Sequence, residues 1–353
     1  MKMIRLFFKW LFRILAFLIA VFFLFVLLPE KETVAPLEPR ASTKYWEMKE
    51  GFKIAYTHVL GDSGRTNAKP PLVYLHGGPG GYVHSSIIET LGELSVFGYD
   101  VYLYDQRGSG LSDRLKKFSE VSFEKHLQDL HEIITTKISA QKVILIGQSF
   151  GSILIAHYAS RYPNKVAKLV FSSPGALEPH RTANGKYLNM DSIYPKPDHM
   201  TLKKPYSFVK DVNKTAFRPK AIVASTGALL LDRKLVSDKQ MDRMLNTLAT
   251  KLVQGVVCDP KNALPEEGGG GLYAYLATNS GEVPDVRPTL RRLETPALIL
   301  HGQCEFQPFS AIYEYVDLFQ NSEYRFIEDA GHEIWWEQKE QYVQRIANFI
   351  GRE

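Results

Sequence analysis

Short apolar runs alternate with amphipathic segments along most of this chain, from about Tyr45 to the C terminus. The runs with the length and composition of buried strands are 53–59, 72–75, 100–104, 142–146, 168–172, 297–300 and 324–327. Between them, apolar residues recur at helical spacing, as at Leu127, Leu130 and Ile134 after the expected N-cap Ser122. Alternating strands and helices predict a mostly parallel central sheet with helices on both faces.

Residues 176–285 interrupt this alternation. They are rich in Lys, Pro and Asn, and they contain one helical stretch at about 237–256 and the glycine run 268–271. No P-loop Lys-Ser/Thr follows the glycines, so we interpret them as a loop and not as a phosphate site. We predict a cap inserted between two strands of the core. The predicted parts are an N-terminal membrane segment (1–29), a linker (30–44), the first part of the core (45–175), the cap (176–285) and the second part of the core (286–353).

The N-terminal segment has the character of a membrane anchor. Residues 14–28 contain no charge, and the stretch from Trp10 to Leu28 would span about 28 Å as a helix, close to the thickness of a bilayer core. All four basic residues of 1–29 precede the apolar run, so the positive-inside rule leaves the N terminus in the cytoplasm and exports everything after Pro29. The alternative is a cleavable signal peptide and a secreted enzyme. No A-x-A-like site follows the run, which favours the anchor.

Composition excludes several partners. Most of the net charge of +5 comes from the N-terminal segment. Without the four basic residues of that segment, the chain has 39 basic and 38 acidic residues. Nothing therefore points to nucleic acid. Cys258 and Cys304 are the two cysteines, and neither CxxC nor Cys/His metal spacing occurs. We expect two free thiols, a disulfide being the alternative in an oxidising compartment, and neither a metal nor an organic cofactor. The oligomeric state stays open.

A Gly-x-Ser-x-Gly motif, Gly147 to Gly151, lies between an expected strand and an expected helix. In this setting the motif forms a sharp turn that projects the serine above the sheet, and small neighbours are needed because two backbones crowd there. A serine hydroxyl is a weak nucleophile until a base takes its proton. Ser149 is therefore the candidate nucleophile.

The candidate base is His332, which follows the last expected strand in Ala330-Gly331-His332. The base needs an acidic partner, and Glu305 lies in the turn after strand 297–300, where the chain order Ser, Asp/Glu, His places the acid. Asp329 is the competing candidate, but it is close in sequence to His332. The neighbouring Glu333 does not form an HExxH zinc motif, because Trp336 replaces the second histidine.

Two backbone N–H groups are the candidate oxyanion donors. One belongs to Phe150, directly after the nucleophile, and the other to Gly78 in the glycine loop His76–Gly81. Absent side chains in that loop allow the main chain to approach a substrate.

These motifs resemble those of the prolyl iminopeptidases among the α/β-hydrolases. The resemblance rests on HGGPGG (76–81), DQRGSGLS (105–112), GQSFG (147–151), the HGxxE turn (301–305) and Gly331-His332, and it covers about 45–175 and 286–353. It implies an α/β-hydrolase fold with a cap and supports the roles given to Ser149, His332, Phe150 and Gly78, with Glu305 in place of the usual Asp.

The resemblance does not extend to the cap. Family aminopeptidases carry a Trp-x-x-Trp-Glu-like segment there, with acids that receive the substrate amine. Residues 176–285 contain no tryptophan, and we could align none of the acids Glu178, Glu266, Glu267 and Glu282 with that segment. We expect hydrolysis of a peptide or small-molecule substrate through an acyl-enzyme. Prolyl-aminopeptidase-like activity is favoured over a carboxylesterase, lipase or thioesterase, and a non-catalytic ligand receptor on the same fold is the remaining alternative.

Overall fold

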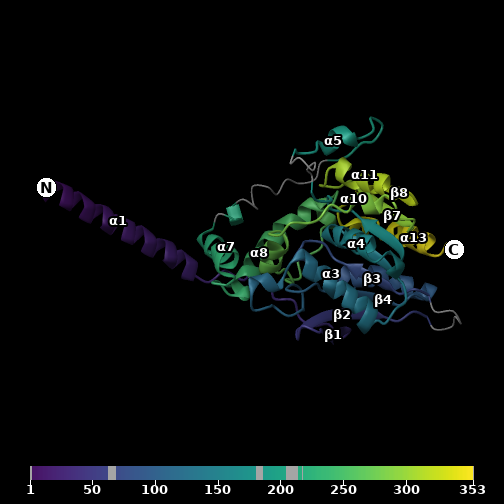
Figure 1. Cartoon of the computed structure of the whole chain (residues 1–353), viewed down its shortest axis with the longest axis horizontal. Coiled ribbons are helices and arrows are strands. Elements are labelled where there is room, and N and C mark those ends of the chain that lie inside the picture. Colours follow the sequence, from purple (N-terminus) through teal and green to yellow (C-terminus); the bar gives the residue numbers. More distant parts are fainter. Residues whose placement is uncertain (1, 63–68, 180–185, 204–213, 217, 353) are drawn as a thin grey trace.

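A mostly parallel sheet of 8 strands forms the centre of the molecule, as predicted (Figure 1). The computed structural model describes residues 2–62, 69–179, 186–203, 214–216 and 218–352. The spatial order is β1-β2-β4-β3-β5-β6-β7-β8. Strands β3 to β8 are parallel to one another, whereas β2 is antiparallel to both β1 and β4. The strands are β1 (Thr43–Glu47), β2 (Lys53–Val59), β3 (Leu72–Leu75), β4 (Val101–Tyr104), β5 (Val143–Gln148), β6 (Val166–Ser172), β7 (Ala297–Cys304) and β8 (Ser322–Gly331).

Helices cover both faces of this sheet. The α-helices are α1 (Lys2–Leu27), α2 (Ser85–Gly92), α3 (Phe123–Glu132), α4 (Phe150–Arg161), α5 (Met190–Ile193), α7 (Pro219–Leu231), α8 (Asp238–Leu252), α9 (Leu272–Thr278), α10 (Arg287–Leu290), α11 (Phe309–Leu318), α12 (Ile334–Glu337) and α13 (Lys339–Ile350). Successive side chains of a strand point to opposite faces. In β3, Val73 and Leu75 join the core under α3 and α4, whereas Leu72 and Tyr74 join the core under α2 and α13.

The predicted strands are all present, with ends shifted by a few residues. The predicted N-cap is also present, since the Ser122 hydroxyl accepts a hydrogen bond from the N–H of Lys125 at the start of α3. The alternation did not predict β1, a short edge strand whose side chains are mostly exposed. Trp46 fixes this strand to the sheet by stacking on Tyr56, with ring centroids 3.8 Å apart.

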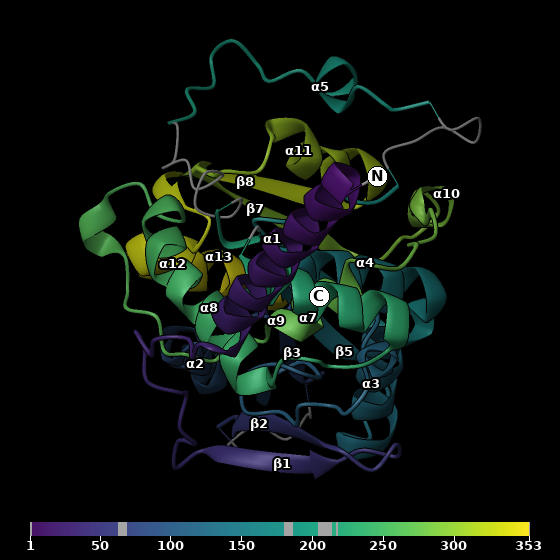
Figure 2. The same ribbon diagram turned by 90° about the vertical axis from the view of Figure 1, so that its left-hand side faces the viewer.

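The segment between β6 and β7 contains α5, α7, α8, α9 and α10. Figure 2 shows α7, α8 and α9 on the side of the domain from which α1 projects. The predicted helix at about 237–256 corresponds to α8. These three helices therefore lie between the N-terminal helix and the sheet.

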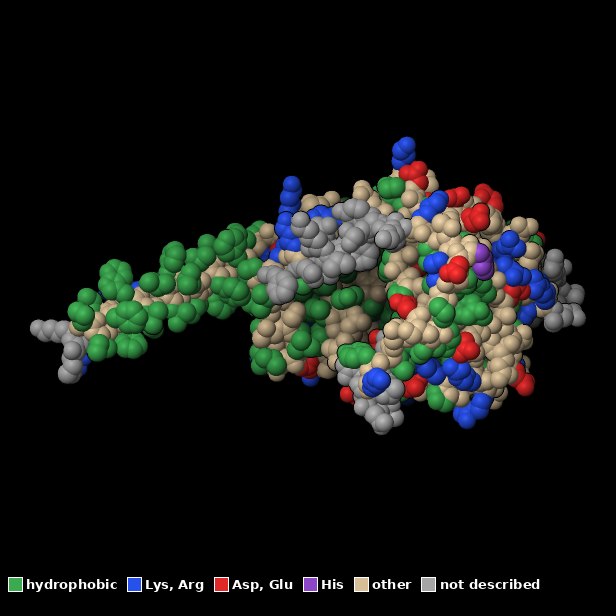
Figure 3. All heavy atoms as spheres, turned by 90° about the horizontal axis from the view of Figure 1, so that it is seen from above, with side chains coloured by type: hydrophobic (Ala, Val, Ile, Leu, Met, Phe, Trp, Pro, Cys, Tyr) green, Lys and Arg blue, Asp and Glu red, His purple; other side chains and the backbone are tan. Residues whose placement is uncertain are grey.

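Helix α1 extends away from the globular domain (Figure 1). Its part from Met3 to Leu27 is the one helix among the described residues that is long and apolar enough to cross a membrane. Nearly all of its side chains are exposed, as Figure 3 shows by the hydrophobic atoms along its length. A signal sequence would have the same length and composition.

Candidate active site

Ser149 lies on the sharp turn between β5 and α4. Its backbone has φ 51° and ψ −117°, a strained conformation that costs about 1–3 kcal/mol. The turn needs glycine on both sides. A Cβ on Gly147 would lie 2.6 Å from the backbone of Gly151, and a Cβ on Gly151 would lie 2.8 Å from the carbonyl carbon of Leu75. The motif thus produces the tight strand-turn-helix arrangement that its sequence predicts.

Glu305 and His332 come together from the ends of two neighbouring strands. Glu305 follows β7 and His332 follows β8. The imidazole Nδ1 lies 2.7 Å from one carboxylate oxygen of Glu305 and 2.9 Å from the other. The N–H of Gln307 also donates to the first oxygen at 2.9 Å, which fixes the carboxylate in its turn. With Nδ1 held by the carboxylate, Nε2 is the nitrogen left for proton transfer.

Burial and mutual charge act in opposite directions on this pair. Burial alone would lower the pKa of His332, but the charge of Glu305 and the hydrogen bond to it raise that pKa above its ordinary value. Burial alone would raise the pKa of Glu305, but the charge of His332 and the same hydrogen bond bring it below its ordinary value. The arrangement therefore stabilises a carboxylate next to an imidazolium.

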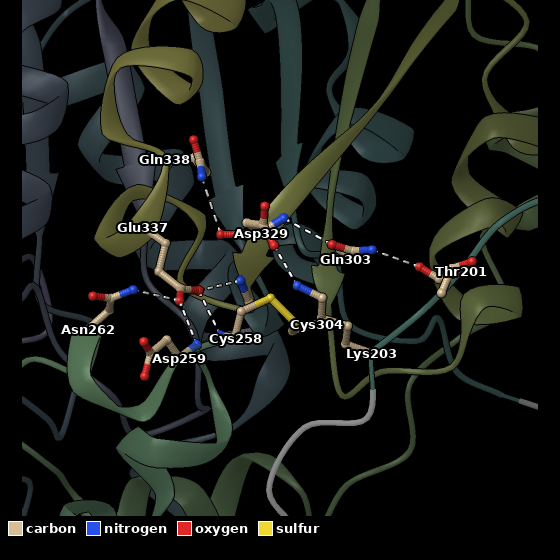
Figure 4. Close-up of a disulfide and its surroundings, with 11 residues drawn as sticks. Thr201, Lys203, Cys258, Asp259, Asn262, Gln303, Cys304, Asp329, Glu337 and Gln338 are labelled. Carbon is tan, nitrogen blue, oxygen red and sulfur yellow. Dashed lines mark hydrogen bonds and ion pairs between the residues drawn. A yellow bond between two sulfur atoms is a disulfide. The ribbon is translucent and has the colours of Figure 1, made fainter.

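Asp329, the competing acid, does not face the imidazole. Its side chain forms an ion pair with Lys203 and is 67% exposed. Its backbone N–H donates a hydrogen bond to the side-chain oxygen of Gln303 at 3.1 Å (Figure 4). Closeness in sequence does not pair Asp329 with His332, since Asp329 binds Lys203 and the imidazole binds Glu305.

The glycine loop after β3 lies against Ser149. A Cβ on Gly77 would lie 2.9 Å from the Cβ of Ser149, and Gly78 has φ +125°, which a residue with a side chain rarely adopts. His76 holds the loop in place, since its Nε2 accepts the N–H of Gln106 at 3.0 Å. Burial lowers the pKa of His76 to about 4, so the ring is neutral and can accept this bond. The main chain of Gly78 lines the same cavity as Ser149.

A cavity of about 310 Å³ unites these groups. Ser149 and His332 both lie in its wall, together with residues of the glycine loop. The segment between β6 and β7 also contributes, with Leu245 and Ala249 of α8 and with Glu266. The further aromatic side chains in the wall are Tyr74, Tyr82, Tyr275, Phe306, Trp335 and Trp336. Most of the wall is therefore apolar.

Two carboxyl groups in this wall were not predicted as site residues. The Glu333 Oε1 accepts Gln148 Nε2 at 3.4 Å, whereas Oε2 is buried without a hydrogen-bond partner among the described residues. Burial raises the pKa of Glu333 to about 7, and it also raises the pKa of Glu266. The charges of Glu305 and Glu266 further raise the pKa of Glu333. Spacing from His332 could have indicated Glu333 and the two tryptophans. Glu266 was named in the sequence only as one of four acids in residues 176–285, and no pattern set it apart from the other three.

The prediction of two free cysteines was wrong. Cys258 and Cys304 form a disulfide with a Cα–Cα distance of 5.2 Å, within the range that a bridge requires (Figure 4). The prediction relied on the general rarity of single bridges in domains of this size. In the fold, the segment after α8 runs beside the end of β7, and this brings the two cysteines together. Cys304 directly precedes Glu305, so the bridge holds one end of the turn that carries the acid.

Glu337 joins the same segment to the other strand end. Its carboxylate accepts the N–H groups of Cys258 at 2.7 Å, Asp259 at 2.9 Å and Gly331 at 2.8 Å (Figure 4). Gly331 precedes His332. The disulfide and Glu337 therefore connect residues 258–259 to the two loops that carry Glu305 and His332.

We expect that replacing Cys258 and Cys304 together by alanine lowers the free energy of unfolding by about 4 kcal/mol. The bridge closes a loop of 46 residues, and the lost loop-closure entropy of the unfolded chain gives this magnitude. Urea unfolding of the full chain in detergent, followed by circular dichroism without reductant, measures the change. Reductant should shift the wild-type midpoint and leave the variant unchanged. Equal midpoints for both proteins would contradict the expectation.

The comparisons with known proteins agree with this architecture. Residues 70–339 match the family described as alpha/beta hydrolase fold, and the chain belongs to this family. It is 25% identical over 280 residues to "Proline iminopeptidase" of Saccharolobus solfataricus, covering 79% of this chain and 84% of that protein. It is 24% identical over 324 residues to "2-hydroxy-6-oxononadienedioate/2-hydroxy-6-oxononatrienedioate hydrolase" of Klebsiella pneumoniae, covering 90% and 98%.

A solved structure gives the same fold. The esterase EaEST of Exiguobacterium antarcticum has a TM-score of 0.56 and 17% identity, and the match covers 88% of this chain and 99% of that one. The similar proteins named here are all hydrolases by name, but they act on different bonds. The family is thus defined, whereas the substrate has to be argued from the cavity.

Proposed function

We propose that this chain is a serine hydrolase in which Ser149, His332 and Glu305 form a catalytic triad. The observation that carries the proposal is the buried contact of Glu305 with His332, which lines the same cavity as Ser149 on its strained turn. Ser149 attacks a carbonyl carbon, and His332 Nε2 takes the hydroxyl proton and returns it to the leaving group. A water molecule, activated by the same imidazole, then hydrolyses the acyl-enzyme. Glu305 stabilises the imidazolium that forms in both halves.

The developing oxyanion binds the backbone N–H groups of Phe150 and Gly78 in this proposal. Phe150 is the first residue of α4, so its N–H belongs to a helix N-terminus that favours negative charge. The closeness of the glycine loop to the Ser149 side chain supports the second donor. The triad, together with these donors, needs no cofactor.

Residues 176–285 act as a cap over this site in our proposal. Support comes from Leu245, Ala249, Glu266 and Tyr275, which lie in the cavity wall and belong to that segment. A cap of this kind excludes water and selects the substrate, while the strand ends supply the chemistry.

The substrate that fits best carries a positively charged amine next to an apolar group, as the N-terminal residue of a peptide does. Glu333 presents a buried, unpartnered carboxyl oxygen in the wall, and Glu266 lies close enough for its charge to act on Glu333. A bound ammonium group would offset the cost of ionising both. Glu267 is not available for this role, because it forms an ion pair with Arg40 at 2.5 Å. A prolyl-aminopeptidase-like activity is therefore our first choice.

An esterase that acts on an uncharged acyl group is the second candidate. The apolar wall favours it, since aromatic side chains and the α8 residues Leu245 and Leu252 could hold an acyl chain. Hydrolysis rates on proline arylamide and on short and long acyl esters distinguish the two.

We expect Glu266→Gln to raise KM for proline arylamide about 10-fold or more, since a hydrogen bond to a charged group contributes about 1.5–3 kcal/mol. Uncharged acyl esters should be cleaved at the wild-type rate. Steady-state kinetics on both substrates measures this. The control is Glu282→Gln, an exposed acid of the same segment, which should change neither rate. Equal losses on arylamide and ester would contradict an amine site at Glu266.

The location follows from the N-terminal helix and the disulfide. In our proposal α1 spans the membrane with its basic N-terminal side in the cytoplasm, and the hydrolase lies on the other side. The bridge between Cys258 and Cys304 supports this, because disulfides persist in oxidising compartments. A secreted domain, released after signal cleavage, would also lie in an oxidising compartment, so the disulfide is compatible with both alternatives. Mass spectrometry of the mature N-terminus distinguishes the two, the anchor requiring an intact N-terminal segment.

A fluorophosphonate probe tests the central proposal directly. The probe forms a covalent bond only with a serine that an adjacent base activates. We expect one adduct on the folded full chain, on the peptide that contains Ser149. Folded protein without an adduct would instead favour a ligand receptor that retains the fold.

A further inference from the structure

Helix α7 has its large apolar side chains on the outside. Apart from Lys220 at its start, the side that packs into the domain consists of small residues, namely Ala221, Ala224, Gly227 and Ala228. The exposed side carries Ile222 (42% exposed), Leu229 (59%) and Leu230 (75%), which lie within about 100° of one another around the helix axis. A surface helix of a water-soluble domain has the opposite arrangement, with large apolar residues in the core and polar residues in water. Ile222, Leu229 and Leu230 are called the α7 face below.

Ion pairs hold α7 beside the end of α1. The Lys220 ammonium, 3% exposed, donates to the carbonyl oxygen of Leu28 and lies 3.4 Å from the Glu30 carboxylate. Arg218, at the N-cap of α7, pairs with Glu30 at 2.9 Å. Arg243 of α8 pairs with Glu32. Helices α1 and α7 are also in contact. The residues that follow the apolar run are thus bound to the start of α7 and to α8.

This junction sets the distance between α7 and the bilayer. In our proposed topology Leu28 and Pro29 mark the place where the chain leaves the hydrocarbon region. Because Lys220 contacts Leu28 directly, α7 begins at that level. Figures 1 and 2 show the same arrangement, with α7 at the base of α1 on the end of the domain from which α1 projects.

We propose that the α7 face lies in the headgroup–acyl boundary of the same bilayer that α1 crosses. The inference rests on the proposed membrane anchor and adds a second contact to it. A bilayer is the occupant that continues directly from α1, and leucines and isoleucines are the side chains that enter it. Basic residues beside the face, Arg218 and Arg233, are exposed and can reach anionic headgroups.

The second contact has a consequence for the enzyme. A single helix anchor lets a domain rotate and tilt, whereas two contacts fix its orientation. Helix α7 leads into α8, whose residues Leu245, Ala249 and Leu252 line the cavity. The proposed cap is therefore held at the membrane surface.

Depth-dependent fluorescence quenching tests the inference. Full-length Leu230→Cys is labelled without reductant with an environment-sensitive NBD dye, which spares the native cysteines because they form the disulfide. The protein is reconstituted in vesicles of phosphatidylcholine and phosphatidylglycerol that carry spin-labelled lipids. We expect a blue-shifted emission that the lipid-borne quencher reduces several-fold.

Two matched positions control the experiment. Val96, 64% exposed, lies in the 3-10 helix η1 (Glu93–Phe97), which packs on α13 at the far end of the domain. A probe at Val96→Cys should show no quenching, and a probe at Phe17→Cys in the middle of α1 should be quenched strongly.

The outcomes separate the inference from the anchor. Quenching at 17 with none at 230 would overturn the α7 contact and leave the anchor intact. Absence of quenching at both positions would overturn both proposals. A blue shift at 230 without quenching would mean that a second copy or another protein covers the α7 face, and this would also overturn the inference.

Discussion

Replacing Ser149 by alanine should lower kcat by about 10⁶-fold and abolish the fluorophosphonate adduct. The change removes the one hydroxyl that the strained turn projects into the cavity beside His332. Without it there is no acyl-enzyme, and only binding and oxyanion stabilisation remain. The Ser149→Ala variant should still hydrolyse the substrate about 10³–10⁴-fold faster than the uncatalysed reaction in water. Turnover of the most reactive substrate, together with intact-mass analysis of the adduct, measures both effects.

The matched control for this experiment is Ser160→Ala. Ser160 lies in α4, the helix that starts directly after Ser149, and its hydroxyl donates locally to the carbonyl oxygen of His157 at 2.8 Å. It should keep wild-type turnover and labelling. A Ser149→Ala protein that still turns over substrate at the wild-type rate would show that another group is the nucleophile.

The core of the fold and the candidate triad could be predicted because local patterns alone specify them. The central strands β3 and β5 are continuous apolar runs, buried on both faces, which stand out in the sequence. The motif around Ser149 predicts its own geometry, since the crowding at Gly147 and Gly151 permits no side chain. Glu305 and His332 were found from their positions after successive strands. Parallel strands bring their carboxyl ends to one edge, so order along the chain becomes closeness in space.

The parts that could not be predicted depend on contacts between distant segments. Edge strand β1 has no alternating pattern, because only Trp46 of its five residues is buried. Glu266 enters the cavity from the segment between β6 and β7, whose path no periodicity defines. The disulfide requires Cys258 and Cys304, which are 46 residues apart in the sequence, to lie side by side. The presence of only two cysteines had favoured free thiols. The substrate-contacting side chains are thus less predictable than the chemistry.

The disulfide and Glu337 give the unpredicted segment a structural role near the site. The N–H of Glu333 donates to the carbonyl oxygen of Val256 at 3.2 Å, and a Cβ on Gly331 would lie 2.5 Å from Val257. Residues 256–259 are therefore packed against the loop of His332 and bonded covalently to the turn of Glu305. Since the turn and the loop must keep their relative position within a fraction of an ångström, this double link explains why a bridge occurs at this place.

Glu305→Gln should lower kcat by about 10⁴-fold while the fold is retained. A glutamine of the same size keeps the turn, but it removes the charge that stabilises the imidazolium and the acceptor that sets the tautomer. The pH profile gives a second measure. His332 must be neutral to accept the proton, so activity rises as the pH increases through its pKa. Glu305 raises that pKa, and the acidic limb of the profile should therefore move to lower pH in the variant.

Asp329→Asn is the control that the chain itself offers for this change. Asp329 is close in sequence to His332, but it pairs with Lys203 at the surface. Removing its charge should leave both kcat and the acidic limb unchanged, because exposed ion pairs contribute little and this one does not reach the imidazole. If Asp329→Asn reduced kcat and Glu305→Gln did not, the acid would be assigned to the wrong residue. A drop in kcat for Glu305→Gln without any shift of the acidic limb would mean that Glu305 supports the turn and does not act on the charge of His332.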